Sequence, residues 1–211
     1  MKVANKTEPN NYGPLQNASM LYARATLFNV ARNNGFVAIV SVSDAVNAML
    51  IEDLEARIAA DKHDVLLIRL NALAKAPGDQ NGKPITSGQI VEEIARALAP
   101  QVKVKSGPKA RLEQVHELLK VSHRAGRRRL LVIEDAELLP IATLKHLKRV
   151  VELRGDMQRL IGVALLGRPA LFDHLGSENV VMRELMQRCE IVELEDARAG
   201  YRADLVNGGA L

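Results

Sequence analysis

Two adjacent carboxylates follow a run of aliphatic residues in the second half of the chain. Residues 130–133 read L-L-V-I, and Glu134 and Asp135 come directly after them. Four large apolar residues in a row are typical of a strand buried on both faces, and open α/β sheets carry their ligand sites at the carboxyl ends of such strands. One acid there can hold Mg²⁺ while the next polarises a water for attack on a phosphate. The two acids can equally cap the following helix and face solvent.

Aliphatic runs alternate with amphipathic stretches, and this alternation predicts the elements that position the two acids. Nearly continuous aliphatic strands are typical of a parallel sheet with helices on both faces. The expected strands are residues 36–40, 65–70, 130–133, 160–166 and 191–194. Apolar residues at helical spacing predict helices at 18–32, 50–58, 90–98, 112–119, 144–151, 170–175 and 181–188. We therefore expect an α/β fold with a parallel five-stranded sheet, and Gly35 as the stop of the first helix.

The length of 211 residues suits one domain with two arms. Residues 1–17 are rich in Asn and offer little to bury, which predicts a flexible N-terminal arm. Residues 18–195 form the expected α/β core. Residues 196–211 are expected to form a short C-terminal helix and tail.

The composition excludes several classes of protein. The chain is 47% hydrophobic but only 3% aromatic, so its core must be aliphatic. Cys189 is the only cysteine, which excludes a disulfide framework and a zinc-binding cysteine cluster and favours a cytoplasmic location. No run approaches the roughly 18 apolar residues of a membrane span. The five histidines show no ligand spacing, so no metal site is expected unless Glu134 binds magnesium.

Basic residues are concentrated rather than spread evenly. The net charge is +4, but residues 103–129 hold nine Lys and Arg against two Glu, so the rest of the chain carries a net charge of −3. A basic surface of this kind can follow a DNA backbone without reading bases; a solvated face with arginines that protect a sheet edge is the alternative. The basic residues predicted to bind DNA are Lys103, Lys105, Arg127, Arg128, Arg129, and Lys145, Lys148 and Arg149 on one helix face.

The order of four segments resembles the AAA-type P-loop ATPases that assist transposition and DNA uptake or secretion, the group of phage Mu B, TniB and ExeA-like proteins. The segments are F-V-A-I-V at 36–40, L-L-V-I-E-D-A-E-L-L at 130–139, L-I-G-V-A-L-L-G-R-P-A-L at 160–171 and M-Q-R-C-E-I-V-E-L-E at 186–195. The resemblance covers residues 18–201 and implies an AAA core. It also implies DNA contacts by Lys75 and Lys83 in the long loop 71–87, where related filaments contact DNA. Family members continue into a helical lid, which is expected to be largely absent here.

The phosphate loop departs from the family pattern G-x-x-x-x-G-K-[ST]. The aligned residues, 41–48, read S-V-S-D-A-V-N-A, so the glycines, the lysine and the final hydroxyl are replaced. Asp44 would place a negative charge where a triphosphate sits, and two charges about 4 Å apart repel by roughly 4 kcal/mol at an effective dielectric near 20. Ser41, Ser43 and Asn47 remain the candidate contacts of this degenerate Walker A loop.

Three further site residues follow from the resemblance. The usual Asp-Glu order is reversed, so Glu134 takes the metal-holding place and Asp135 the water-activating place. Arg188 matches an arginine that reaches a neighbouring subunit's nucleotide, or it closes a helix against its dipole. Arg168 matches a polar sensor of the γ-phosphate, or it is an ordinary turn residue.

These observations predict a DNA-binding, non-hydrolysing AAA-like transposition helper from a mobile element or phage, which recruits or regulates a transposase or target DNA. Glu134 and Asp135 are then relics of catalysis. The expected partners are DNA, a transposase or a related ATPase subunit, and other subunits in a homo- or hetero-oligomer, but no membrane. No cofactor is expected. The alternative is an active, divergent ATPase of the same family that uses ATP and Mg²⁺.

Overall fold

The computed structural model describes residues 18–60, 64–74, 82–176 and 180–194. The predicted N-terminal arm, the C-terminal tail and Lys75 lie outside these ranges. None of the helices in the described ranges combines the length and apolar character that a membrane crossing requires.

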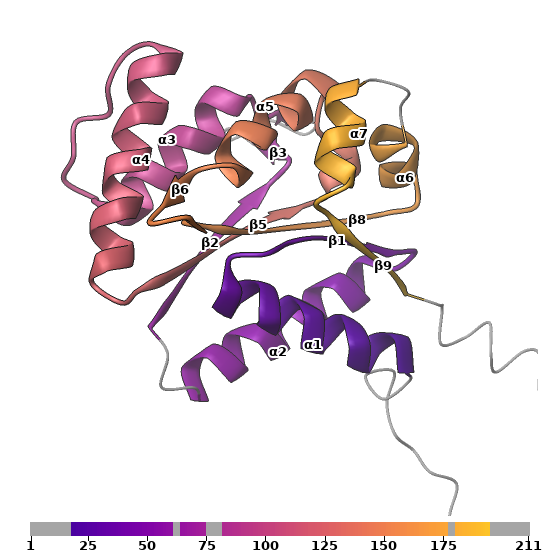
Figure 1. The fold of residues 1–211 in the computed structure, drawn as a ribbon. Helices are drawn as coiled ribbons and strands as arrows, with labels where there is room; N and C mark the ends of the chain where they lie inside the picture. The colour runs from indigo at the N-terminus through magenta and orange to yellow at the C-terminus, as the bar shows by residue number, and fades with distance from the viewer. Residues whose placement is uncertain (1–17, 61–63, 75–81, 177–179, 195–211) are drawn as a thin grey trace, which may run out of the picture.

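Five parallel strands form one central sheet, as the sequence predicted. The strands are β1 (Phe36–Ser41), β2 (Val65–Asn71), β5 (Arg128–Glu134), β8 (Gly162–Gly167) and β9 (Glu190–Leu194). Their order across the sheet is β2-β5-β8-β1-β9, and every neighbouring pair is parallel (Figure 1). The carboxyl ends of all five strands therefore meet at one edge of the sheet, which we call the carboxyl edge. The opposite edge is the amino edge.

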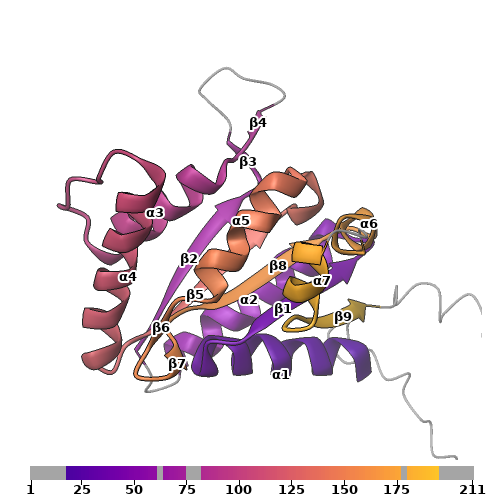
Figure 2. The same ribbon diagram turned by 45° about the horizontal axis from the view of Figure 1, so that its top comes forward.

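Helices cover both faces of the sheet (Figure 1). One face carries α1 (Ala18–Asn33) and α2 (Asp44–Ala60), and the other carries α3 (Ser87–Leu98), α4 (Pro108–Arg124), α5 (Ile141–Val151), α6 (Ala170–Leu175) and α7 (Val180–Met186). A 3₁₀ turn, Ala136–Leu138, follows β5. Two short hairpins were not predicted: β3 (Leu73–Ala74) with β4 (Lys83–Pro84), and β6 (Arg154–Gly155) with β7 (Gln158–Arg159). The β3–β4 hairpin projects from the end of β2 (Figure 2).

The core consists of two aliphatic layers, one on each face of the sheet. Val37, Ile39 and Val132 pack towards α1 and α2, whereas Leu131 and Ile133 pack towards α3, α4 and α5. Because successive side chains on a strand point to opposite faces, this assignment also fixes the direction of the charged residues at both ends of β5.

Helix α1 ends at the amino edge in a left-handed cap. Asn34 has φ 53°, and the Gly35 N–H donates to the Val30 carbonyl at 3.3 Å, which is the pattern of a Schellman cap. Asn34, rather than the predicted Gly35, thus takes the left-handed position; Asn is the residue that most often replaces Gly there. The same helix end presses on β8, because a Cβ at Gly162 would lie 2.6 Å from the Val30 oxygen.

We expect Gly162→Ala to destabilise the fold by about 1–3 kcal/mol, because an added methyl forces a backbone shift in a close-packed contact. The loss should appear as a lower midpoint in urea unfolding. Gly88→Ala is the matched control: at Gly88 the nearest atom to an added Cβ is the flexible tip of Arg111, at 3.1 Å, and alanine favours the helix. Equal stability of the Gly162 variant and the wild type would contradict the close contact.

Candidate functional site at the carboxyl edge

The connection between β1 and α2 is short, and its polar groups hydrogen-bond to one another. Only Val42 and Ser43 separate the end of β1 from the first residue of α2. The Ser43 N–H donates to the Ser41 hydroxyl at 3.1 Å, and the Ser43 carbonyl accepts from the N–H groups of Val46 and Asn47 at 3.1 and 3.2 Å. Residues 44–48 of the segment aligned with a phosphate loop are therefore a helical turn. Ser41 is buried and Asn47 is half-buried.

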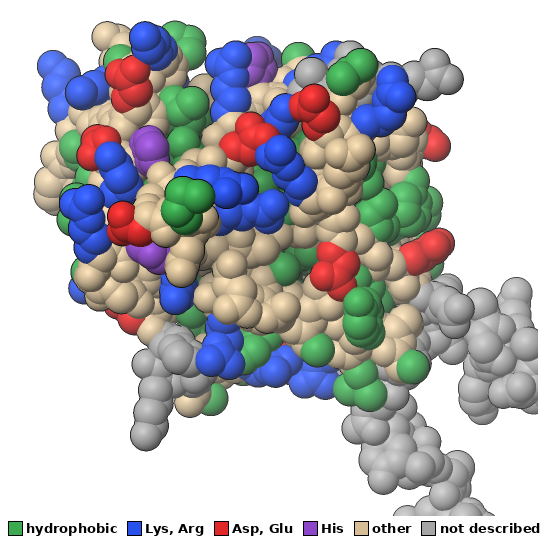
Figure 3. All heavy atoms as spheres, in the orientation of Figure 1, with side chains coloured by type: hydrophobic (Ala, Val, Ile, Leu, Met, Phe, Trp, Pro, Cys, Tyr) green, Lys and Arg blue, Asp and Glu red, His purple; other side chains and the backbone are tan. Residues whose placement is uncertain are grey.

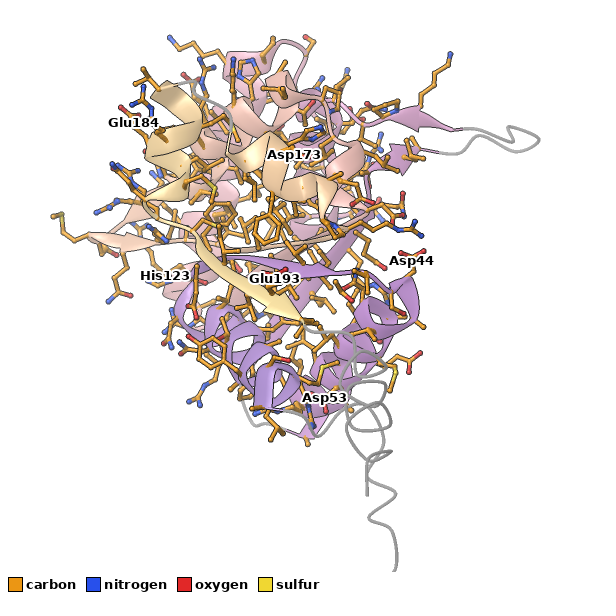
Figure 4. The ribbon with its side chains drawn as sticks, turned by 90° about the vertical axis from the view of Figure 1, so that its right-hand side faces the viewer. Asp44, Asp53, His123, Asp173, Glu184 and Glu193 are labelled. Atoms are coloured by element: carbon orange, nitrogen blue, oxygen red, sulfur yellow. The ribbon has the colours of Figure 1, made fainter. Side chains whose placement is uncertain are left out.

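The guanidinium group of Arg168 donates to both carboxylate oxygens of Asp44. The Arg168 Nε donates to Asp44 Oδ1 at 2.9 Å, and Nη2 donates to Oδ2. Hydrogen bonding to Arg168 lowers the pKa of Asp44, so the carboxylate is charged at neutral pH. Asp44 stands at the start of α2, on the side from which the β3–β4 hairpin projects (Figure 4). The sensor-like arginine and the acid of the aligned loop are thus joined into one ion pair.

Glu134 is held by an arginine of the neighbouring strand. The Arg69 Nε and Nη2 donate to Glu134 Oε1 at 3.1 and 3.0 Å, and its Nη1 donates to Glu55 of α2 at 2.8 Å. Burial opposes the charge on Arg69, but hydrogen bonds to Glu55 and Glu134 outweigh it and raise the pKa of Arg69. The candidate metal ligand is therefore one end of a three-residue ion cluster.

Asp135 is also engaged with β2. The Asn71 side-chain amide donates to Asp135 Oδ2 at 2.5 Å, and the Asn71 Oδ1 accepts from the Leu73 N–H at 2.8 Å. Asp135 adopts φ 53°, a left-handed conformation that Asp tolerates better than most residues, and its carbonyl accepts from Leu138 in the 3₁₀ turn. Both acids of the predicted catalytic pair thus have partners on the edge strand β2.

Glu137 is a member of this site that sequence reasoning missed. Its Oε2 accepts from the Arg168 N–H at 3.1 Å, and a Cβ at Gly167 would lie 2.6 Å from the same oxygen. The carboxylate therefore caps the end of β8 and fixes the backbone from which Arg168 extends. Its position three residues after Glu134, in the segment E-D-A-E, was the available signal.

Arg188 does not join the carboxyl-edge site. It lies just before β9, at the amino edge of the sheet, and donates to Glu152 at the end of α5. Lys148 of α5 likewise pairs with Glu184 of α7, and this hydrogen bond lowers the pKa of Glu184. These pairs tie α5 to the segment that leads into β9.

Within the described residues, no three His, Cys, Asp or Glu side chains are grouped to hold a metal ion. Cys189 offers no nucleophile either, because burial raises its pKa to about 12. The remaining chemistry at the carboxyl edge is that of paired charges.

We expect Cys189 to resist alkylation in the folded protein. With a pKa near 12, roughly one thiol in ten thousand is ionised at pH 8, and only the thiolate is nucleophilic. Iodoacetamide labelling followed by mass spectrometry should be slow in buffer and fast in urea, where the thiol regains its ordinary pKa. Labelling in buffer as fast as that of a free cysteine would contradict the burial.

The residues predicted to bind DNA fall into separate groups. Lys145 and Arg149 share one face of α5. Lys83 lies on β4, and the chain just after β4 meets α5 where the Thr143 hydroxyl donates to the Ile85 carbonyl at 3.3 Å. Lys103 and Lys105 form a second exposed group in the loop between α3 and α4. Lys148 pairs with Glu184 of α7.

The three consecutive arginines before the acidic strand have different environments. Arg127 is exposed and pairs with Asp64 at 2.9 Å, and Arg128 lines a hollow at the amino edge. Arg129 is only 3% exposed, so it does not belong to a DNA-facing surface as predicted. The alternation of strand β5 turns it inward, towards α4, and burial lowers its pKa.

Comparisons with known proteins identify the fold. No family model matches the sequence, and no curated protein matches it closely enough to be a relative. Solved structures do match. The ORC2 protein of Aeropyrum pernix, in ADPNP-ADP complexes, aligns with TM-score 0.59 and 14% identity over 90% of this chain and 52% of its own. Cdc6p from Pyrobaculum aerophilum aligns with TM-score 0.57 and 16% identity over 86% and 46%.

A third match is a chain of Drosophila ORC bound to DNA, with TM-score 0.55 and 12% identity over 84% of this chain and 93% of that one. This chain spans about half the length of the two archaeal proteins. The α/β core therefore has the fold of the AAA+ ATPases of the ORC and Cdc6 group.

Proposed function

We propose that this protein is a DNA-binding, AAA-like assembly factor that does not hydrolyse ATP, and that it acts as a transposition helper. The observation that carries the proposal is the bidentate pair of Asp44 with Arg168 at the carboxyl edge. In the ATPases that the sequence resembles, this edge of the sheet binds the phosphates of a nucleotide. In this chain, the charged side chains of Asp44 and Arg168 occupy it.

The residues at this edge do not fit a magnesium nucleotide. A phosphate loop needs glycines, free backbone N–H groups and a lysine, whereas residues 42–43 form a two-residue turn that leads directly into α2. A phosphate near the helix start would meet Asp44, and Arg168 would have to release that carboxylate before it could bind the phosphate. Arg69 occupies Oε1 of Glu134, so a metal ion would have to bind the other oxygen, beside a guanidinium group that repels it.

DNA association rests on the basic group Lys83, Lys145 and Arg149. Lys145 and Arg149 are four residues apart on α5 and so share one helix face, and Lys83 lies on the adjoining hairpin. Phosphate contacts by such residues bind DNA without regard to sequence. The structural similarity to Drosophila ORC, whose structure was solved bound to DNA, supports this assignment.

The proposed partners are DNA, a transposase or a related ATPase subunit, and further AAA-like subunits in a homo- or hetero-oligomer. The transposition role is supported by the order of the sequence motifs that resemble the Mu B, TniB and ExeA-like group. Arg188 pairs with Glu152 of its own chain. A role for it in a neighbouring subunit's site stays a prediction.

A divergent ATPase is the second candidate. It is favoured by the ORC2 structure of the same fold, which was solved with ADPNP and ADP. In this alternative, Glu134, Asp135 and Arg168 exchange their present partners for Mg²⁺, a water and a phosphate. The two candidates differ in whether nucleotide binding requires magnesium and Glu134.

We expect no ATP hydrolysis and no Mg²⁺-dependent ATP binding in the micromolar range, with or without DNA. Isothermal titration calorimetry at matched Mg²⁺ and EDTA concentrations measures the binding, and phosphate release measures the hydrolysis. Glu134→Gln should leave both results unchanged. Hydrolysis by the wild type that Glu134→Gln abolishes would establish the ATPase instead.

We expect the double variant Lys145→Gln/Arg149→Gln to weaken DNA binding and to reduce the slope of log K against log salt by about two, since each lost phosphate contact removes roughly 0.9. Lys103→Gln/Lys105→Gln is the matched control, because it removes the same charge from a different surface. Fluorescence anisotropy at several salt concentrations measures both. Equal effects of the two double variants would contradict a special role of the α5 surface, because binding would then depend on net charge alone or on both surfaces alike.

A further inference from the structure

A hollow of about 510 Å³ opens at the amino edge, on the opposite side of the sheet from the proposed nucleotide-like site. It is lined by three arginines and three amides: Arg32 and Asn33 of α1, the cap residue Asn34, Arg128 of β5, and Gln158 and Arg159 of β7. Its volume is within the range of small-molecule sites. No acidic residue lines it.

The arginines come from three elements that are fixed against one another. The Asn34 side-chain amide donates to the Arg159 carbonyl at 2.6 Å, which fastens the end of α1 to the β6–β7 hairpin. Arg128 shares its face of β5 with Leu130, which packs towards α1. In the space-filling view, Lys and Arg side chains gather beside the hairpin (Figure 3). The hollow thus lies where the end of α1, the start of β5 and the β6–β7 hairpin meet.

Two of the three arginines keep an unpaired charge within the described residues. No carboxylate there lies within ion-pair distance of Arg128 or Arg159. Burial, followed by repulsion from Arg154 and Arg188, lowers the pKa of Arg159, and Glu152 opposes this only in part. The carbonyl end of α1 contributes about half a negative charge. The guanidinium groups of Arg128 and Arg159 exceed it several-fold.

We propose that this hollow binds a phosphomonoester or diphosphate group, carried by a small molecule or by the end of a nucleic acid strand. Such a group carries a charge of about −2 and three acceptor oxygens, so it can engage several guanidinium forks, whereas a carboxylate offers one charge and two oxygens.

Calorimetric titration of the whole chain with pyrophosphate tests the site. Wild-type protein should bind it, and Arg128→Gln and Arg159→Gln should each weaken binding by roughly tenfold or more, which is typical for loss of a charge-assisted hydrogen bond. Arg127→Gln is the matched control: it removes the same charge from the adjacent residue, which pairs with Asp64 outside the hollow. Its affinity should stay within about twofold of the wild type.

Two oligonucleotides, one with a 5′-phosphate and one without, distinguish the sources of the phosphate. Tighter binding of the phosphorylated strand that Arg159→Gln removes identifies a strand end, and equal binding of both strands alongside retained pyrophosphate binding identifies a small molecule. Circular dichroism should show that every variant is folded. Absence of pyrophosphate binding at millimolar concentration, or equal binding by the wild type and both hollow variants, would overturn the proposal.

Discussion

The ion pair between Asp44 and Arg168 joins the start of α2 to the end of β8 and determines the chemistry of the carboxyl edge. A helix N-terminus attracts an anion, and Asp44 supplies one from within the chain. The guanidinium group of Arg168 then donates to both carboxylate oxygens of Asp44. Glu137 holds the backbone of Arg168 in place, so the pair is supported from β5 as well. An external phosphate would have to displace a partner that is covalently part of the same fold.

Glu134 and Asp135 are held in the same way, by partners within the chain. Adjacent carboxylates repel each other, so groups that donate hydrogen bonds to them stabilise the charged pair. Arg69 and Asn71, both on β2, donate these hydrogen bonds. The polar side chains at the carboxyl edge thus bind one another. An AAA+ fold therefore does not by itself imply ATP chemistry.

The sheet could be predicted because each of its strands is a nearly continuous aliphatic run. The cap of α1 and the burial of individual arginines could not be predicted, because they depend on how the elements pack. Asn34, and not the predicted Gly35, takes the left-handed position at the end of α1, where its side chain donates a hydrogen bond to the Arg159 carbonyl. Consecutive arginines look alike in sequence, but the pleat of β5 sends Arg128 towards α1 and buries Arg129 on the other face. Of the site, the acids were identified, but their partners depend on strand order, which the sequence leaves open.

The two edges of the sheet differ in how their arginines are matched. At the carboxyl edge, Arg69 and Arg168 each pair with carboxylates from a neighbouring element. At the amino edge, Arg128 and Arg159 line the hollow together with amides, and Arg154 and Arg188 repel the charge of Arg159. Grouping like charges costs free energy, and a fold that keeps such a group in a rigid hollow favours any anion able to enter it. The arginines that lack acidic partners in the described part of the chain therefore lie at the amino edge, on the opposite side of the sheet from Asp44 and Arg168.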